Sequence, residues 1–440
     1  MSSYDSDYEF DEKVYVKKAY NKMKAKISPK KIAYSNQKEA AKKVMTEFDK
    51  GKISVVLVAQ PGAGKTGTFG YIAYKMVMKG KFSYNDIYFI SGMSDLDWKE
   101  TIKSGILSPF RKNIYHRNNF DDLKKKWLEK KPKNILIIQD ECHIAAGKDQ
   151  QLSLMLKECG LLDINYIKDN NIKFLAVSAT PGRVKKDLQK WGKEYTGAVL
   201  LKNADSYRGF QFLKDNDLLR PPLFLSKKED CKDISKTIKE RWNKPLYHII
   251  RSGTKVYDIV LQNITSMCKK EGWVVREHNA KNRIEDIDEV MSSRPSVHTF
   301  ILVKGFWRAG KRLVRKYVGV VSETSQKHRN SDVTAQGLVG RFCDNDSSTF
   351  NPLKSTLFFC DVEAINQYID LVEHKFNYDD IVYERNWKRS FADKQNVEGL
   401  EEDEEEEDVE LSEDSEDSQY EYHNEEEVES DIRRFRTFRL

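Results

Sequence analysis

A glycine-rich segment after the apolar run Ile53–Val58 has the residue types of a phosphate-binding loop. The residues that we expect to contact the phosphates are Gln60, Pro61, Gly62, Ala63, Gly64, Lys65, Thr66 and Gly67. Glycines let backbone N–H groups approach phosphate oxygens, a lysine in this place reaches the outer phosphates, and a threonine hydroxyl ligates magnesium. The segment therefore predicts a site for a nucleoside triphosphate and Mg²⁺, with Lys65 as a catalytic residue and Thr66 as a metal ligand.

Two carboxylates follow a second apolar run, at residues 134–139, where the chain reads Asp140-Glu141-Cys142-His143. In a parallel sheet, ligands bind beyond the carboxyl ends of the strands, so these acids should lie beside the phosphate-binding loop. We expect Asp140 to help hold the magnesium ion and Glu141 to orient and deprotonate an attacking water molecule. The pair predicts hydrolysis of the bound triphosphate.

The sequence around these segments alternates between strand-like and helix-like patterns. Expected strands lie at 53–58, 86–90, 134–139 and 173–178, and after Pro221 and Pro222 at 246–250, 273–276, 299–303, 317–321 and 356–359. Expected helices lie near 36–48, 257–268, 334–342 and 362–374. Repeated alternation of this kind predicts an α/β fold with two parallel-sheet domains.

We divide the chain into four segments. Residues 1–28 form a charged arm, either flexible or a loosely docked helix. Residues 29–215 form the first α/β domain, with the phosphate-binding loop, and residues 216–396 form the second. Residues 397–440 form an acidic tail that we expect to be disordered, because it has too little apolar surface to offset the entropy of ordering.

Charge is divided unevenly along the chain. The net charge is +6, although the segment from Glu398 to Asp431 carries 20 acidic residues and no Lys or Arg. The rest of the chain is therefore strongly basic, which suits a polyanionic partner, and nucleic acid is the leading candidate. The tail could compete with that polymer, contact a protein partner or simply keep the chain soluble, and its composition does not decide among these roles.

The cysteines and the apolar runs restrict the class of protein. The six cysteines are scattered, without the paired spacing of a zinc or iron–sulfur site, which is typical of a reducing, intracellular compartment. No apolar run reaches the length of a membrane span, and the acidic N-terminal segment does not resemble a signal peptide. We expect an intracellular protein that neither spans a membrane nor is secreted.

The motifs together resemble those of superfamily 2 helicases of the DExH type. The matching segments are AQPGAGKT at 59–66, DECH at 140–143 and SAT at 178–180, which correspond to motifs I, II and III of that family. The resemblance covers about residues 34–345 and implies two RecA-like domains, with ATP in the cleft between them and nucleic acid across both. The later motifs most resemble those of helicases from large DNA viruses and phages.

The resemblance also implies roles for single residues around the nucleotide. Gln37 stands where the family often uses a glutamine to contact adenine. His143, Ser178, Thr180 and Gln336 stand where the family couples the ATP site to the second domain. His143 in particular would couple the ATP site at motif II to motif III and would not take part in the chemical step.

Further positions match the parts of the family that contact nucleic acid. Ser91 and Gly92 follow an expected strand as in motif Ia, Arg251 ends the stretch HIIR as in motif IV, and Lys304 and Arg308 lie in the place of motif V. Contacts to a nucleic-acid backbone need only donors and positive charge, which ordinary solvated loops also supply. The resemblance favours DNA over RNA as the partner and leaves the oligomeric state open.

The segment Gln336-Gly337-Leu338-Val339-Gly340-Arg341 resembles motif VI, which supplies the arginine finger of the family. Arg341 is the expected finger, a catalytic residue that stabilises charge on the transferring phosphate. The match departs from the family in two places: the Gly-Arg pair falls one residue late, and Asp344 stands where a second arginine is usual. Either Arg341 acts alone, or another arginine such as Arg308 or Arg329 shares the task.

These observations lead to a hypothesis of an ATP-dependent helicase or translocase that moves along or unwinds nucleic acid. One alternative is a nucleic-acid-stimulated ATPase that remodels protein–DNA complexes or branched DNA without processive unwinding. A second is a binding module in which ATP only sets affinity, although such a module has no need of Glu141 as a base. A P-loop kinase or GTPase would not account for DECH, SAT and the second α/β domain.

Overall fold

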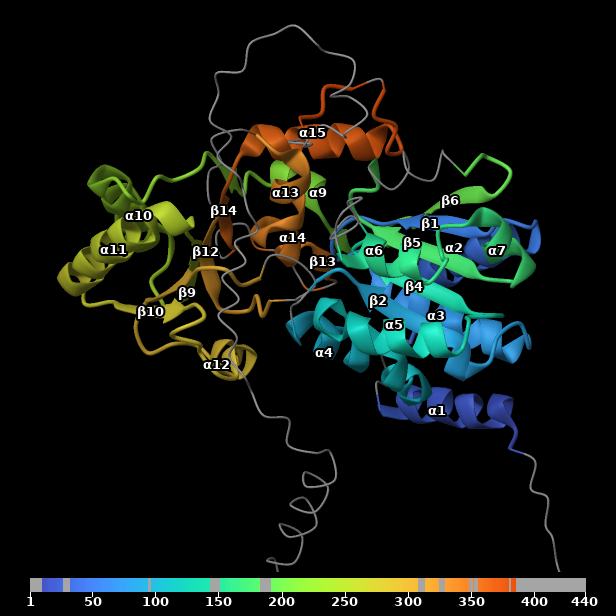
Figure 1. Cartoon of the computed structure of the whole chain (residues 1–440). Coiled ribbons are helices and arrows are strands. Elements are labelled where there is room, and N and C mark those ends of the chain that lie inside the picture. Colours follow the sequence, from blue (N-terminus) through green and yellow to red (C-terminus); the bar gives the residue numbers. More distant parts are fainter. Residues whose placement is uncertain are drawn as a thin grey trace, which may run out of the picture. The chain divides into compact units, whose positions relative to one another are not determined.

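The apolar runs of the sequence form two sheets in which every strand pair is parallel (Figure 1). The computed structural model describes residues 10–26, 32–93, 96–142, 151–182, 191–307, 313–323, 329–346, 348, 351, 355–379 and 381–384. These described residues belong to one compact unit that ends at Asn386.

The first sheet has the strand order β3-β2-β4-β5-β1-β6. Its strands are β1 (Ser54–Val58), β2 (Ile87–Ser91), β3 (Ile114–His116), β4 (Leu136–Asp140), β5 (Lys173–Ser178) and β6 (Thr196–Leu200). Every residue of β1 and β2 is buried, because helices cover both faces of the sheet.

Two groups of helices and short 3₁₀ turns surround this sheet. They are α1 (Glu12–Lys26), α2 (Ser35–Asp49), α3 (Lys65–Met78), η1 (Tyr84–Asp86), α4 (Leu96–Gly105), η2 (Ser108–Asn113), η3 (Arg117–Asn119), α5 (Phe120–Glu129), α6 (Gln151–Glu158) and α7 (Ile164–Asp169). Apolar side chains of α2, α3 and α4 share one cluster with Val55 and Leu57 of β1. Those of α5, α6 and α7 share another with Ile137 and Phe174.

The second sheet has the strand order β10-β11-β9-β12-β14-β8. Its strands are β8 (Leu219–Arg220), β9 (Tyr247–Arg251), β10 (Val274–His278), β11 (Thr299–Val303), β12 (Val318–Ser322) and β14 (Leu357–Phe359). Its helices are α9 (Phe210–Asp215), α10 (Lys228–Arg241), the short η4 (Thr254–Val256), α11 (Tyr257–Glu271), α12 (Ile287–Ser292), α13 (Ser331–Gln336), α14 (Leu338–Phe342) and α15 (Val362–Glu373).

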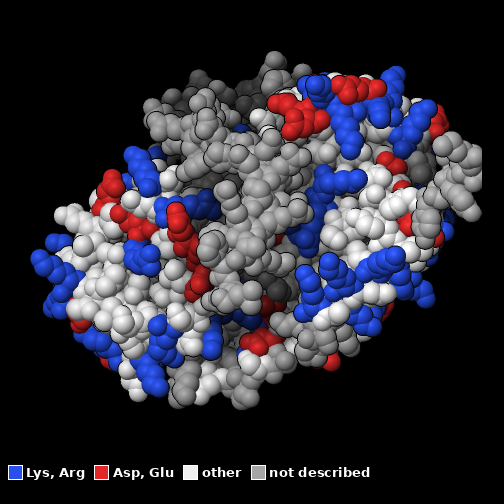
Figure 2. Space-filling model, turned by 90° about the horizontal axis from the view of Figure 1, so that it is seen from below, with Lys and Arg blue, Asp and Glu red and all other residues white. Residues whose placement is uncertain are grey.

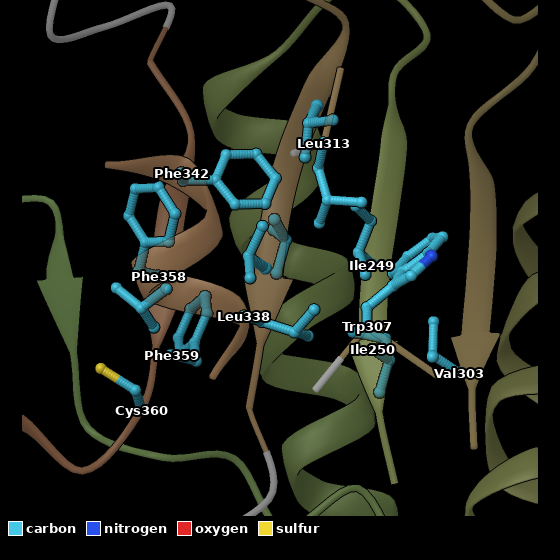
Figure 3. Close-up of a cluster of buried hydrophobic side chains, with 14 of the residues drawn as sticks. Ile249, Ile250, Val303, Trp307, Leu313, Leu338, Phe342, Phe358, Phe359 and Cys360 are labelled. Atoms are coloured by element: carbon cyan, nitrogen blue, oxygen red, sulfur yellow. The ribbon is translucent and has the colours of Figure 1, made fainter. Parts of the chain in front are cut away.

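The core of the second sheet contains large aromatic side chains. Figure 3 shows Trp307, which is fully buried, beside Ile249 and Ile250 of β9. Phe342 of α14 and Phe358 of β14 pack edge to face with ring centroids 5.4 Å apart. This packing anchors α14, which carries Arg341, and Trp307 to the sheet.

Two smaller elements join parts of the chain that are distant in sequence. An antiparallel ribbon pairs β7 (Tyr207–Arg208) with β13 (Asp344–Asn345). Helix α1, in the segment for which the sequence left open a flexible arm or a docked helix, packs on α3: the ring of Tyr20 stacks on Tyr74 at 4.3 Å between centroids.

The expected fold class, an α/β protein with two parallel-sheet halves, is confirmed, and most strands lie within one or two residues of their predicted bounds. Strands β3, β6 and β8 were missed. They are short or lie at sheet edges, and only one residue of β6 is fully buried, so they lack the apolar runs by which buried strands are recognised.

One helix prediction was wrong in a way that has a clear cause. The helix expected over 334–342 is interrupted at Gly337, between α13 and α14. The carboxylate of Glu323 accepts a hydrogen bond from the backbone N–H of Leu338 at 2.6 Å. A Cβ on Gly337 would lie 2.4 Å from an oxygen of the same carboxylate, so a larger residue there would displace the Glu323 side chain.

The predicted segment bounds at residues 28, 215 and 396 stay predictions. The acidic tail lies outside the described residues. No helix in the described part of the chain is long and apolar enough to cross a bilayer.

A pair of histidines is buried in the second sheet. His248 of β9 is fully buried, and its Nε2 lies 2.9 Å from Nδ1 of His298. Burial lowers the pKa of both imidazoles, that of His248 well below its ordinary value, and the neighbouring His298 lowers it further. The folded state therefore holds His248 neutral.

We expect this histidine to make the protein sensitive to mild acid. Because the pKa of His248 is lower in the folded than in the unfolded chain, its contribution to stability is complete above about pH 6.5 and is lost as the pH falls below that value. The His248→Phe variant should lose less free energy of unfolding between pH 7.5 and 5.5 than the wild type, by at most about 1.4 kcal/mol per pH unit. Urea titrations at several pH values measure this, and identical slopes for the two proteins would contradict it.

Candidate active site

The expected site residues meet at one edge of the first sheet. In the parallel register, Val58 pairs with Ser178, Val177 with Asp140 and Gln139 with Ile90. The carboxyl ends of β1, β5, β4 and β2 therefore lie side by side. The phosphate-binding loop, Ser178–Thr180, Asp140–Glu141 and Ser91 all leave the sheet at these ends, as the sequence predicted.

The phosphate-binding loop runs into the first turn of α3 through Gly64, whose φ of +102° is in the left-handed region. The Gln37 side chain lies over this turn: its amide nitrogen donates to the carbonyl of Gly64 at 2.9 Å, and its amide oxygen accepts from the N–H of Tyr34 at 2.8 Å. A Cβ on Gly64 would lie 2.1 Å from the Gln37 amide nitrogen. Gln37 thus lies beside the loop and holds its backbone, and its expected contact to adenine stays a prediction.

Lys65 and Glu141 form an ion pair at the centre of the site. The Lys65 Nζ lies 3.0 Å from Oε1 of Glu141, and the two side chains are 13% and 3% exposed. Glu141 has a φ of +47°, uncommon for a residue with a side chain, which turns the chain sharply after β4. The turn is held by the N–H of Cys142, which donates to Val177 of β5 at 3.1 Å.

Asp140 is buried beside this pair. The indole N–H of Trp98 donates to its Oδ2 at 3.0 Å, whereas Oδ1 has no hydrogen-bond partner in the described part of the protein. Burial and the negative charge of Glu141 raise the pKa of Asp140 to about 6, against the opposing effects of Lys65 and Trp98. A buried carboxylate oxygen without a partner, next to the phosphate-binding loop, suits a cation, so Asp140 fits the role of magnesium ligand.

Elements of the second half of the chain contact the segment Ser178–Gly182. The Gln336 side chain of α13 donates a hydrogen bond to the hydroxyl of Thr180. The Tyr368 hydroxyl of α15 donates to the carbonyl of Ala179 at 2.9 Å, and the N–H of Gly182 donates to the Tyr378 hydroxyl at 3.1 Å. Of the residues expected to couple the two halves, Thr180 and Gln336 therefore contact each other directly, and the Ser178 hydroxyl accepts from the N–H of Thr180 at 3.0 Å.

Arg341 extends from α14 near the two carboxylates. Its guanidinium donates to the carbonyl of Gln336, with Nη2 at 2.6 Å and Nε at 3.1 Å. Burial lowers the pKa of Arg341, and the negative charge of Glu141 opposes that shift. Arg329, the alternative finger, instead forms ion pairs with Asp361 at 2.9 Å and Glu384 at 2.8 Å.

The turn after α14 packs directly on the phosphate-binding loop. Gly62 has a φ of +71°, and a Cβ there would lie 1.8 Å from the carbonyl oxygen of Cys343. The ribbon β7–β13 reinforces this contact, because the Tyr207 hydroxyl donates to the carbonyl of Pro61 at 2.6 Å and Arg208 pairs with Asp346 at 3.0 Å. The loop is thus held by both the strand before it and the second half of the chain.

The residues expected to contact nucleic acid differ in burial and in the groups that they contact. Ser91 and Gly92 are buried at the end of β2, where the Ser91 hydroxyl accepts from the N–H of Met93 at 3.3 Å. Lys304 is partly exposed, with its ammonium 5.1 Å from the ring centroid of Tyr257. Arg251 forms an ion pair with Glu323 at 2.9 Å in which the side chains are only 13% and 9% exposed.

The Arg251 ion pair has a structural function, because Glu323 also accepts from the start of α14 and Arg251 also donates to the carbonyl of Phe306 at 3.1 Å. The role of Arg251 in nucleic-acid binding stays a prediction, as do those of the other residues in this group. His143 and Arg308 lie outside the described residues.

Two residues of the site were not found by sequence analysis. Trp98 lies in the stretch DLDWKE and Tyr207 in SYRGF, and neither stretch belongs to a phosphate-binding or carboxylate motif. A tryptophan among charged residues indicates only a buried position on an amphipathic helix. Their contacts to Asp140 and Pro61 join residues 42 and 146 positions apart, which no local pattern can reveal.

No family model matches the sequence of this chain. An uncharacterised protein, L594 of Acanthamoeba polyphaga mimivirus, is 25% identical over 388 residues, which are 80% of this chain and 91% of that protein.

Solved structures with a similar chain path include three that bind nucleic acid or are called helicases. The ATP-dependent Type ISP restriction-modification enzyme LlaBIII bound to DNA has a TM-score of 0.49 and 13% identity, and the match covers 75% of this chain and 28% of that one. The Escherichia coli DEAH/RHA helicase HrpB has a TM-score of 0.47 and 12% identity, over 73% of this chain and 42% of that one. S. cerevisiae Dbp5 bound to RNA and ADP BeF3 has a TM-score of 0.45 and 12% identity, over 83% of this chain and 95% of that one. The chain thus spans less than a third of the restriction-modification enzyme. At TM-scores below 0.5 these are distant similarities, and we derive the function below from the residues of this chain.

The Tyr207→Phe variant tests the contact between the ribbon and the phosphate-binding loop. Loss of the hydroxyl leaves the carbonyl of Pro61 without this donor and should lower the free energy of unfolding by about 1 kcal/mol. If the contact orders the loop for phosphates, the Kd for ADP should also rise about five-fold. Urea denaturation and titration with a fluorescent ADP analogue measure the two effects.

Tyr166→Phe is a matched control, because the Tyr166 hydroxyl also donates to a proline carbonyl, that of Pro132 at 3.1 Å, on the face of the sheet covered by α7. It should lower stability by a similar amount and leave ADP binding unchanged. Equal nucleotide affinities in the two variants would show that Tyr207 contributes to stability alone.

Proposed function

We propose that this protein is an ATP-dependent nucleic-acid motor of the superfamily 2 helicase type. The observation that supports it best is the buried contact between Lys65 and Glu141 at 3.0 Å, next to Asp140 and within the electrostatic influence of Arg341. A phosphate-binding lysine, a metal-binding carboxylate, a base and a finger arginine are the parts that triphosphate hydrolysis requires.

ATP binding would change the partner of Lys65. In the structure its ammonium neutralises Glu141, and an arriving triphosphate offers a stronger anion to the same group. Lys65 would then turn to the outer phosphates, and Glu141 would be released to orient and deprotonate a water molecule. Thr66 and Asp140 would hold Mg²⁺, which when bound neutralises charge on the phosphates.

Arg341 would supply positive charge opposite the phosphate-binding loop. It extends from α14, whose following turn already lies against Gly62, so a small displacement of this turn changes its distance from the loop. Such an arginine stabilises the charge that develops on the transferring phosphate.

Hydrolysis would be transmitted through Ser178–Thr180. These residues leave the same sheet edge as Asp140, and Gln336 and Tyr368 contact them from the second half of the chain. Release of phosphate would therefore alter a contact between the two halves, and repeated cycles would move the protein along one strand. His143 would take part in this coupling.

We propose nucleic acid as the track, with DNA favoured over RNA. Basic side chains form several patches on the face shown in Figure 2. The candidate contacts are Ser91, Gly92, Arg251, Lys304 and Arg308. The relative in Acanthamoeba polyphaga mimivirus supports the viral character of the later motifs. Strand separation measured beside ATP hydrolysis distinguishes an unwinding enzyme from one that remodels protein–DNA complexes or branched DNA.

The Glu141→Gln variant tests hydrolysis. Phosphate release by the wild type should be stimulated by one of single-stranded DNA, duplex DNA or RNA. In the variant the stimulated rate should fall by about 10² or more, because the base is lost, while ADP still binds. Glu271→Gln, which removes a carboxylate paired with Lys239 at 3.0 Å on α11, serves as a control with unchanged activity. Hydrolysis that no polymer alters would contradict the motor.

A comparison of two arginine variants tests the assignment of the finger. Arg341→Ala should reduce the stimulated rate by about 10³, whereas Arg329→Ala should reduce it less than about three-fold, because Arg329 pairs with Asp361 and Glu384 instead. Phosphate release at saturating ATP and polymer measures both. The opposite order of effects would assign the finger to Arg329.

A further inference from the structure

Helix α4 contacts both residues that we expect to hold magnesium. At its N-terminal part, Trp98 is 1% exposed and its indole N–H donates to Oδ2 of Asp140 at 3.0 Å. At its last residue, a Cβ on Gly105 would lie 2.5 Å from Cγ2 of Thr66, so the helix end lies against that side chain. One ten-residue helix therefore bridges Asp140 on β4 and Thr66 on α3.

The same helix follows a segment expected to contact nucleic acid. Strand β2 ends at Ser91, directly after Ile90, and Ile90 pairs with Gln139, the residue before Asp140 on β4. Met93 is buried in the same apolar cluster as Trp98, and its carbonyl accepts from the N–H of Arg117 at 2.9 Å. A displacement of Ser91–Met93 would therefore act on the packing around Trp98.

An indole N–H suits the role of fixing a metal-binding carboxylate. It is a donor only and carries no charge, so it cannot replace the cation or neutralise Asp140. By occupying Oδ2 it sets the plane of the carboxyl group and leaves Oδ1 without a hydrogen-bond partner among the described residues. Groups that hold a ligating carboxylate in this way strengthen metal binding by about 10- to 100-fold.

We propose that Trp98 is a positioning residue for hydrolysis, which orients Asp140 toward Mg²⁺ and links that carboxylate, through α4, to the nucleic-acid contact at Ser91–Met93. Binding of the polymer would thereby adjust the metal site on which hydrolysis depends. The inference rests on the proposed function for the polymer, whereas the link from Trp98 to the metal site rests on the hydrogen bond itself.

The Trp98→Phe variant removes the donor and keeps an aromatic ring. The first measurement is the affinity of the full chain for a fluorescent ADP analogue at increasing Mg²⁺ concentration. The Mg²⁺ concentration for half-maximal strengthening of ADP binding should rise about ten-fold in the variant. Affinity for ADP in EDTA should stay within two-fold of the wild type, because the phosphate-binding loop is unaltered.

Trp127→Phe is the matched control. Trp127 is equally buried, on α5, but its ring packs against Tyr88 at 5.3 Å in the apolar cluster on the other face of the sheet. It should lose stability without a change in the Mg²⁺ requirement. Equal Mg²⁺ requirements in Trp98→Phe and wild type, or equal shifts in both variants, would overturn the proposal.

A second measurement concerns the polymer. At saturating Mg²⁺ and ATP, Trp98→Phe should lower the ratio of phosphate release with and without the activating polymer about five-fold, with the Kd for the polymer unchanged. An unchanged ratio would overturn the link to Ser91–Met93. If the wild type shows no stimulation by any polymer, the proposed motor fails, while the Mg²⁺ titration still decides the role of Trp98.

A variant at the other end of α4 covers the case in which Trp98→Phe does not fold. Gly105→Ala places a methyl group against Thr66 and should also raise the Mg²⁺ requirement, with ADP binding in EDTA kept. An unchanged requirement in a folded Gly105→Ala protein would overturn the bridging role of the helix.

Discussion

The in-register parallel pairing of β2, β4, β5 and β1 is the constraint on which the rest of the site depends. Parallel strands end at the same edge, so four segments that are far apart in the chain leave the sheet next to one another. Asp140 can contact Trp98 because β2, which precedes α4 in the chain, lies next to β4. Glu141 can reach Lys65 because a single strand, β5, separates β4 from β1. A shift of one residue in that register would turn the carboxylate of Asp140 to the other face of the sheet.

The charged side chains at this edge are buried, and their need for partners explains the ion pair and the hydrogen bond found there. A buried carboxylate is costly unless it is paired, which accounts for the ammonium of Lys65 at Glu141 and the indole N–H at Asp140. Asp140 and Glu141 are adjacent carboxylates, and the ammonium of Lys65 pairs with Glu141, so an additional cation would stabilise the arrangement.

Much of this arrangement could be predicted from the sequence. The segment Gln60–Thr66 and the pair Asp140–Glu141 are local patterns, each placed directly after an apolar run, and the structure puts them side by side. The helix break at Gly337 could not be predicted, because it is set by Glu323, which is distant in sequence and reaches the N–H of Leu338. The ion pair of Arg251 with Glu323 could not be predicted either, because it joins residues at the ends of separate strands, and the role of Arg251 in nucleic-acid binding stays a prediction.

The sequence by itself determined the α/β fold class, the glycine-rich turn at Gln60–Thr66 and the two carboxylates after a strand, because the backbone geometry of a glycine turn and the burial of an apolar strand depend on neighbouring residues. Only the tertiary structure decided which side chains complete the site. Trp98 on Asp140, Tyr207 on Pro61 and Gln336 on Thr180 are contacts between separate elements. Their donors have no special local pattern, and their roles follow from where the sheet register and helix packing bring them.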